Sequence, residues 1–172
     1  EYAPRFTFHG FRYVRIEGYD SDSLLQDARA QAMYSDMEDT GSFSCSDERL
    51  NQLMHNIVWS QYGNMLSVPT DCPQRERAGW TGDAQIFCET AALNMDVSAF
   101  FKRWMQNMRL EQTPDGQIPV VIPYHRSYRP ENLGIDGKDS AAGWGDAVTV
   151  LPWNMYLAYG DVRWLSQNYD AM

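Results

Sequence analysis

The sequence is poor in cysteine and histidine, which limits the metal and disulfide chemistry that it can carry. Its 172 residues include only three cysteines, an odd number, and these lack the C-x-x-C spacing of a zinc site. The three histidines, His9, His55 and His125, are too scattered to indicate a metal cluster. We therefore expect no disulfide framework, no metal and no cofactor.

Positive charge and long apolar runs are also scarce. Lys and Arg number 14 against 23 Asp and Glu, so the net charge is -9, which argues against nucleic acid or an anionic membrane as a partner. No apolar run approaches the roughly 18 residues of a membrane span, and the first residues do not resemble a signal peptide. The sequence leaves the cellular location open.

Apolar and aromatic residues are plentiful. They make up 44% and 13% of the chain, which argues against disorder, and the length is sufficient for one domain with a sizeable core. An acidic chain rich in aromatic side chains suits a neutral carbohydrate ligand.

The hydrophobic pattern predicts a mainly helical chain after an extended lead-in. Residues 6–17 are rich in aromatic and β-branched residues and predict a strand, with a second short strand at 28–34. Helical spacing then predicts five helices, beginning near Ser46, Thr81, Val97, Asp146 and Asp161. The positions expected to face the core are Leu50, Leu53, Met54, Ile57 and Val58; Ile86, Phe87, Thr90 and Ala91; Val97, Phe100, Phe101, Trp104, Met105 and Met108; Val148, Leu151 and Tyr156; and Val162, Leu165 and Tyr169.

Two segments between the predicted helices are irregular. Residues 118–124 are apolar but contain two prolines, so we expect an extended segment and not a central strand. Residues 125–142 are predicted to form a long loop, and loops of this length are often functional.

The stretch from Asp71 to Asp83 has the composition of a site. It contains three carboxylates (Asp71, Glu76 and Asp83), two arginines and Trp80, and its backbone is restricted by a proline and two glycines. Glycosidic bond cleavage needs a protonated acid at the leaving oxygen and a second carboxylate on the other side of the sugar. Tryptophan offers a flat apolar surface to a sugar ring.

Each of these residues also has a purely structural interpretation. Asp83 and Asp146 are favoured in the first turn of a helix by its dipole, and Asp71 can cap the turn that Pro73 enters. Trp80 and Trp144 can belong to the core. The run Arg75-Glu76-Arg77 can be a surface ion-pair cluster that contributes little stability.

Several motifs closely resemble the bacterial α-L-rhamnosidases of glycoside hydrolase family 78. They are Ser35–Phe43, Asn64–Asp83 with its Pro-Thr-Asp-Cys-Pro-Gln-Arg run, Asn94-Met-Asp96, Pro114-Asp-Gly116 and Gly143-Trp-Gly-Asp146. The resemblance spans essentially the whole chain. It implies an (α/α)6 barrel preceded by a β-sandwich domain, and hydrolysis of terminal α-L-rhamnosyl bonds with inversion. The substrate it implies is a rhamnose-containing carbohydrate.

By position, Glu76 matches the general acid of the family. The resemblance also assigns substrate-binding positions to Asp71, Arg75, Trp80, Asp83, Trp144 and Asp146. Many relatives have one more acidic residue before the catalytic glutamate, but Gly79-Trp80 sets the register from the other side. A general acid must keep its proton, so we expect both neighbouring arginines to turn away from Glu76, toward Asp71, Asp83 or the substrate.

The resemblance also implies a domain organisation. Residues 1–40 would be the end of a β domain and its linker, and residues 41–172 the N-terminal portion of the catalytic domain, with about five of twelve barrel helices. The general base would lie downstream, so we expect a fragment that is inactive alone. Two alternatives are a non-hydrolytic carbohydrate-binding fragment and an (α/α)6 hydrolase for another sugar.

Overall fold

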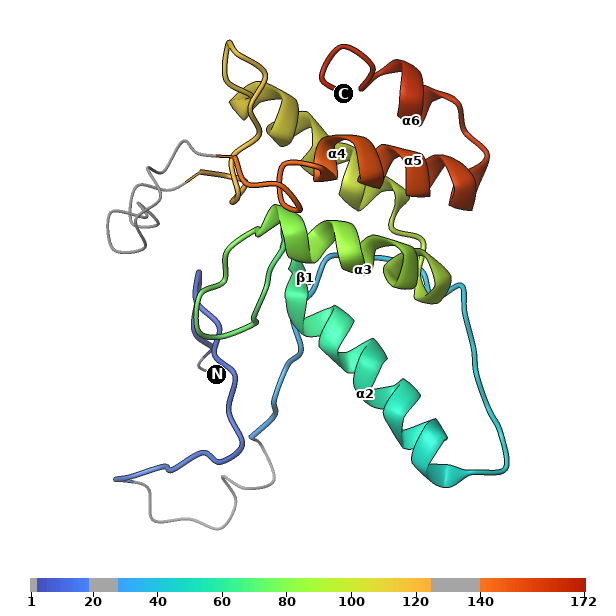
Figure 1. The fold of residues 1–172 in the computed structure, drawn as a ribbon. Coiled ribbons are helices and arrows are strands. Elements are labelled where there is room, and N and C mark those ends of the chain that lie inside the picture. Colours follow the sequence, from blue (N-terminus) through green and yellow to red (C-terminus); the bar gives the residue numbers. More distant parts are fainter. Residues whose placement is uncertain (1–2, 19–27, 125–139) are drawn as a thin grey trace.

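A computed structural model describes residues 3–18, 28–124 and 140–172. The described chain is mainly helical, as predicted, and the arrangement fits part of an (α/α)6 barrel (Figure 1). Its helices are α2 (Glu48–Asn64), α3 (Thr81–Asn94), α4 (Ser98–Glu111), α5 (Ala147–Tyr159) and α6 (Arg163–Ser166). Two short antiparallel strands, β1 (Met65–Leu66) and β2 (Val68–Pro69), follow α2. Within these ranges, no helix combines the length and apolarity that a membrane crossing requires.

The core lies where α4 and α3 pack against α5 (Figure 1). All six core positions predicted for the helix after Val97 are buried, and Trp104, Met105 and Met108 are fully inaccessible. Leu151 and Met155 of α5 complete this cluster. Large apolar side chains at helical spacing dominate the buried volume, so this part of the core was predictable.

Helix α3 buries a face that overlaps only partly with the predicted one: Ala91 is buried and Phe87 packs against the core, as predicted, but Ile86 does not. Its buried residues are Thr81, Gly82, Ala84, Gln85, Cys88, Ala91 and Asn94, whereas Ile86 is 79% exposed. The buried face consists mainly of small side chains, which allow α3 to pack closely against α5. The prediction for Ile86 was therefore wrong.

Helix α2 begins one residue later than predicted, because Asp47 and not Ser46 is its N-cap. Neighbouring elements cover the helix poorly. Asp47 is the N-cap, and its Oδ1 accepts a hydrogen bond of 2.9 Å from the Arg49 amide. The helix extends away from α4 and α5 (Figure 1), so Leu50 and Leu53 are about half exposed, contrary to the prediction, whereas Val58 of the same stripe packs against the core. Gln61 is its one fully buried residue, and it donates to the Ala91 carbonyl of α3.

The lead-in does not form the predicted strands. Residues 3–18 and 28–34 contain no strand in the part of the chain that the structure describes. A strand requires a second strand to pair with its backbone amides and carbonyls, and no described segment supplies one. Residues 37–41 instead attach to the end of α3, where the Thr40 amide donates to the Asn94 carbonyl at 2.9 Å.

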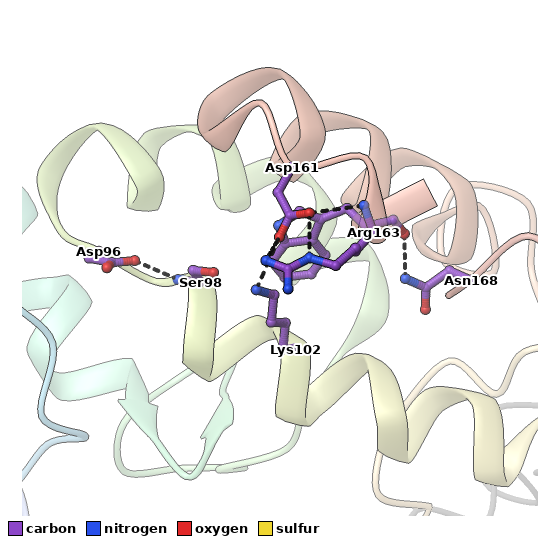
Figure 2. A network of polar contacts seen from close by, with 7 residues as sticks. Asp96, Ser98, Lys102, Asp161, Arg163 and Asn168 are labelled. Carbon is purple, nitrogen blue, oxygen red and sulfur yellow. Dashed lines mark hydrogen bonds and ion pairs between the residues drawn. The ribbon is translucent and has the colours of Figure 1, made fainter. Parts of the chain in front are cut away.

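The C-terminal turn is anchored by a polar network (Figure 2). Asp161 accepts two hydrogen bonds of 2.8 Å from the Arg163 guanidinium, and Lys102 of α4 lies 3.5 Å from the same carboxylate. The buried residues of this region are Trp164 and Asn168. Val162 and Tyr169 are exposed, which contradicts the face predicted for a fifth helix. The reason is that α6 is a single turn, too short to sustain a helical stripe.

The Asp161 network predicts an effect of pH on stability. The Arg163 guanidinium holds the pKa of the Asp161 carboxyl well below its usual range. A lowered carboxyl pKa stabilises the folded state above the unfolded value of about 3.9, and this contribution is lost as the pH falls through and below that value. Asp161→Asn should lower the thermal midpoint by a few degrees at pH 7, and the difference from wild type should shrink at pH 3. Asp170→Asn, an exposed control, should change neither value, and a difference for Asp161→Asn that grows toward pH 3 would contradict the assignment.

Candidate active site

The acid-rich segment forms a closed loop between β2 and α3. The Asp71 amide donates to the Ala78 carbonyl at 3.1 Å, and the Ala78 amide donates back to Asp71 Oδ1 at 3.2 Å. Inside the loop, the Glu76 amide donates to the Cys72 sulfur at 3.0 Å. Asp71 thus has the structural role of closing the loop, in addition to any contact with a ligand.

The far end of the loop is held against the segment near Ile122. The Ile122 amide donates to the Gly79 carbonyl at 2.8 Å, and the Thr81 amide donates to the Val120 carbonyl at 2.9 Å. Trp104 of α4 donates its indole N–H to the Ile122 carbonyl at 3.0 Å. These bonds fix the point where α3 begins. Residues 118–124 form no strand beyond the isolated bridge of Val121 with Trp80, as predicted, but they bend at Val120, Ile122 and Pro123 and are not extended throughout.

Glu76 is half-buried and held by two neighbours in the loop. Trp80 donates its indole N–H to Glu76 Oε2 at 3.0 Å, and Arg75 Nη2 lies 3.0 Å from Glu76 Oε1. The expectation that both arginines avoid Glu76 is therefore wrong for Arg75, whose side chain is 81% exposed. Arg77 does turn away from Glu76, but its Nη2 donates to the Phe8 carbonyl at 3.0 Å, a partner that was not predicted. Trp80 orients the carboxyl group with its N–H, a role that residue type alone did not predict.

Asp71, Cys72 and Glu76 bring three polar atoms close together. One oxygen of each carboxylate and the Cys72 sulfur lie within 4.8 Å of one another, a spacing that could hold a metal ion. These side chains already accept hydrogen bonds from the Ala78 amide, the Glu76 amide and the Trp80 indole. We therefore interpret the cluster as the internal framework of the loop.

A cleft of about 510 Å³ lies beside the loop. Asp71 and Asp83 line it, together with polar groups of Asn64 and Thr70 and apolar groups that include Phe87. Burial raises the pKa of Asp83, and the negative charges of Asp71 and Glu76 act in the same direction. The three predicted carboxylates therefore interact electrostatically, and two of them, Asp71 and Asp83, line the cleft, whereas Glu76 does not.

Trp144 is brought to the same region by the turn before α5. A Cβ atom built on Gly82 would lie 2.9 Å from two atoms of the Trp144 ring, so the ring rests directly on this glycine, next to Asp83 in sequence. Gln85 of α3 donates to the Gly143 carbonyl and secures the turn. Asp146 Oδ2 accepts from the Gly143 amide at 3.1 Å, so it braces the turn that carries Trp144. Most of the predicted loop, residues 125–139, lies outside the described residues.

Sequence reasoning gave no role to some residues that the structure places here. Asn64 and Thr70 line the cleft, and Thr70 Oγ1 donates to Asn64 Oδ1 at 3.0 Å. Both belong to the Asn64–Asp83 motif, which was the available signal. Phe8 had no signal at all, because it precedes its partner Arg77 by 69 positions.

Comparison with known proteins points to one family. Residues 38–172 match the bacterial alpha-L-rhamnosidase 6 hairpin glycosidase domain, and residues 1–34 match the bacterial alpha-L-rhamnosidase concanavalin-like domain. An α-L-rhamnosidase of Formosa agariphila is 46% identical over 175 aligned residues, which cover 100% of this chain and 18% of that protein.

Solved structures agree with these matches. The α-L-rhamnosidase from Dictyoglumus thermophilum has a TM-score of 0.85 at 35% identity, covering 99% of this chain and 18% of that one. The Streptomyces avermitilis α-L-rhamnosidase complexed with L-rhamnose has a TM-score of 0.71 at 42% identity, and the match covers 80% of this chain and 13% of that chain. The chain thus spans less than a fifth of the length of each of these relatives.

Proposed function

The chain belongs to the bacterial α-L-rhamnosidases, and from this premise we propose that the protein containing it hydrolyses terminal non-reducing α-L-rhamnosyl bonds with inversion. The observation that carries the proposal is the placement of Glu76. Its carboxyl group is half-buried, held by the Trp80 indole and close to Asp71, in the loop that matches the family motif. The proposed substrate class is a rhamnose-containing glycan or glycoside.

In the proposed mechanism, Glu76 is the general acid. It donates its proton to the glycosidic oxygen as the bond to rhamnose breaks, which removes the need for an alkoxide leaving group. The indole of Trp80 occupies Oε2, and substrate would replace the exposed Arg75 at Oε1. Arg75 would then bind a hydroxyl or the leaving group.

The remaining candidates are proposed to bind the sugar. Asp71 and Asp83 line the cleft and would accept hydrogen bonds from rhamnose hydroxyls. Burial raises the pKa of Asp83, and the charges of Asp71 and Glu76 act in the same direction. Trp144 would offer its partly exposed ring to a sugar face, with Asp146 supporting its turn.

The spacing of Asp71 and Glu76 does not fit the acid and base pair of an inverting enzyme. Inverting enzymes separate their two carboxyl groups by about 6.5–9.5 Å to accommodate a water molecule. The nearest oxygens of Asp71 and Glu76 are within 4.8 Å, so Asp71 is too close to serve as that base. We propose that the base comes from a part of the protein outside these 172 residues, and that this chain alone hydrolyses little substrate.

We also propose a domain boundary near residue 40. Residues 1–40 would close a preceding β domain and form its linker, and residues 41–172 would begin the catalytic domain. The two family models meet between residues 34 and 38, which supports this division.

The test is hydrolysis of α-L-rhamnosides by the full-length protein that contains this chain. We expect turnover of an aryl α-L-rhamnoside and of a natural rhamnoside, and NMR should detect β-L-rhamnose before mutarotation. An α-D-mannoside of the same aryl alcohol is the control for sugar specificity. α-L-Rhamnose as the first product would contradict inversion, and a folded protein that binds rhamnosides without turnover would establish a binding function instead.

A further inference from the structure

Arg77 connects the acid-bearing loop to the N-terminal segment. Its Nη2 donates a hydrogen bond of 3.0 Å to the Phe8 carbonyl, and its guanidinium carbon lies 4.5 Å from the centre of the Phe8 ring. The arginine thus contacts both the backbone and the side chain of one residue. In Figure 1 the N-terminal segment runs beside the loop that precedes α3.

A second contact lies a few residues away on the same two segments. A Cβ atom built on Gly10 would lie 2.7 Å from Gln74 Oε1, so the backbone at Gly10 approaches the loop closely. Residues 8–10 therefore run along residues 74–77. The first segment falls in the match to the concanavalin-like domain and the second in the match to the glycosidase domain.

The backbone at Arg77 needs an external restraint. Its φ is +54°, in the left-handed region that side chains other than glycine, asparagine and aspartate rarely adopt. Such a conformation persists where surrounding contacts maintain it, and it is often found at functional sites. Loop hydrogen bonds hold the neighbouring Glu76 and Ala78 amides, and the contacts of the Arg77 side chain to Phe8 add a restraint from outside the loop, one residue after Glu76.

We propose that Arg77 is a positioning residue for the general acid, and that the N-terminal segment, through Phe8, holds Glu76 in place. This inference rests on the proposed role of Glu76. Without the contact, Arg77 can relax toward an ordinary φ value, and the Glu76 carboxyl group beside it moves relative to the Trp80 indole and the scissile bond. The β domain would then contribute to catalysis by shaping the acid loop, without touching the substrate.

The test compares leaving groups in the full-length protein. In Arg77→Ala, kcat for a natural rhamnoside should fall by about 10- to 100-fold, because a displaced acid protonates the leaving oxygen poorly. For an activated aryl rhamnoside, which needs less protonation, the loss should stay below about fivefold, and KM should change little. Arg103→Ala, an exposed arginine on α4, is the matched control and should leave both rates unchanged.

Two further variants separate the contact from the backbone conformation. Arg77→Gly accepts the positive φ without steric cost but lacks the guanidinium, so it should be as impaired as Arg77→Ala. Phe8→Ala keeps the carbonyl and loses the ring, so its loss should be smaller, and the double variant Phe8→Ala/Arg77→Ala should match Arg77→Ala alone. Wild-type activity in Arg77→Gly, equal losses on both substrates, or additive losses in the double variant would each overturn the proposal.

Hydrogen exchange tests, independently of activity, whether the contact between Phe8 and Arg77 restrains the loop. The amides of Glu76 and Ala78 are bonded inside the loop, and their exchange should accelerate in both Arg77→Ala and Phe8→Ala. Unchanged exchange would overturn the positioning role. If the wild-type protein hydrolyses no rhamnoside, the proposed function has failed, and the exchange rates still show whether Phe8 and Arg77 restrain the loop.

Discussion

Glu76→Gln is expected to reduce hydrolysis of a natural rhamnoside by about 10³-fold, within the 10²- to 10⁴-fold range of general acid catalysis. The amide is nearly isosteric, and its oxygen can still accept the hydrogen bond that Trp80 donates at 3.0 Å. The variant should therefore retain the Trp80 contact, while it loses the transferable proton and the ion pair with the exposed Arg75. The measurement is kcat/KM of the full-length protein on a natural rhamnoside.

A second substrate, an activated aryl rhamnoside, tests the same assignment of Glu76. Its leaving group departs with little protonation, so Glu76→Gln should retain more activity on it than on the natural substrate. Glu89→Gln changes an exposed carboxylate on α3 and should leave both activities unaltered. Full activity of Glu76→Gln on the natural substrate would mean that another residue is the general acid.

Gly79→Ala is expected to have the largest effect on stability, about 3 kcal/mol or more, because it forces overpacking against backbone. A Cβ atom at this position would lie 2.0 Å from the Ile122 carbonyl oxygen, and a backbone atom cannot move aside as a flexible side chain can. Relief of this clash would break the 2.8 Å bond from the Ile122 amide to the Gly79 carbonyl. It would also disturb the Trp104 bond to Ile122. Urea denaturation of the full-length protein measures the loss.

Gly63→Ala is the matched control for this change. Gly63 lies within α2 and is exposed, and an added Cβ atom would make an ordinary contact of 3.5 Å with Pro73. Alanine is favoured over glycine inside a helix by about 0.5–1 kcal/mol, so this variant should be neutral or more stable than wild type. Equal destabilisation by both substitutions would show that the approach of Gly79 to Ile122 is not the cause.

The helices were predictable to the extent that their partners lie within the described chain. The stripe from Val97 to Met108 is buried as expected, because α5 covers it. The apolar spacing of α2 is just as regular, yet Leu50 and Leu53 remain half exposed. Periodicity indicates which side of a helix is apolar, but a neighbouring element decides whether that side is buried. The strands expected at residues 6–17 and 28–34 are absent from the described part of those ranges for the same reason.

In the candidate site, too, the sequence determined some features and the tertiary structure decided others. The sequence by itself determined that Asp71, Glu76, Trp80 and Asp83 are close, since a short loop with a proline and two glycines carries them all. It also determined the family, through motifs spread along the whole chain. The tertiary structure decided the contacts: Trp80 donates to Glu76, Arg75 pairs with Glu76, and Trp144 rests on Gly82. Local chain stiffness limits how far apart neighbouring residues can lie, whereas side-chain partners, and a contact such as Phe8 with Arg77, arise only when distant segments pack together.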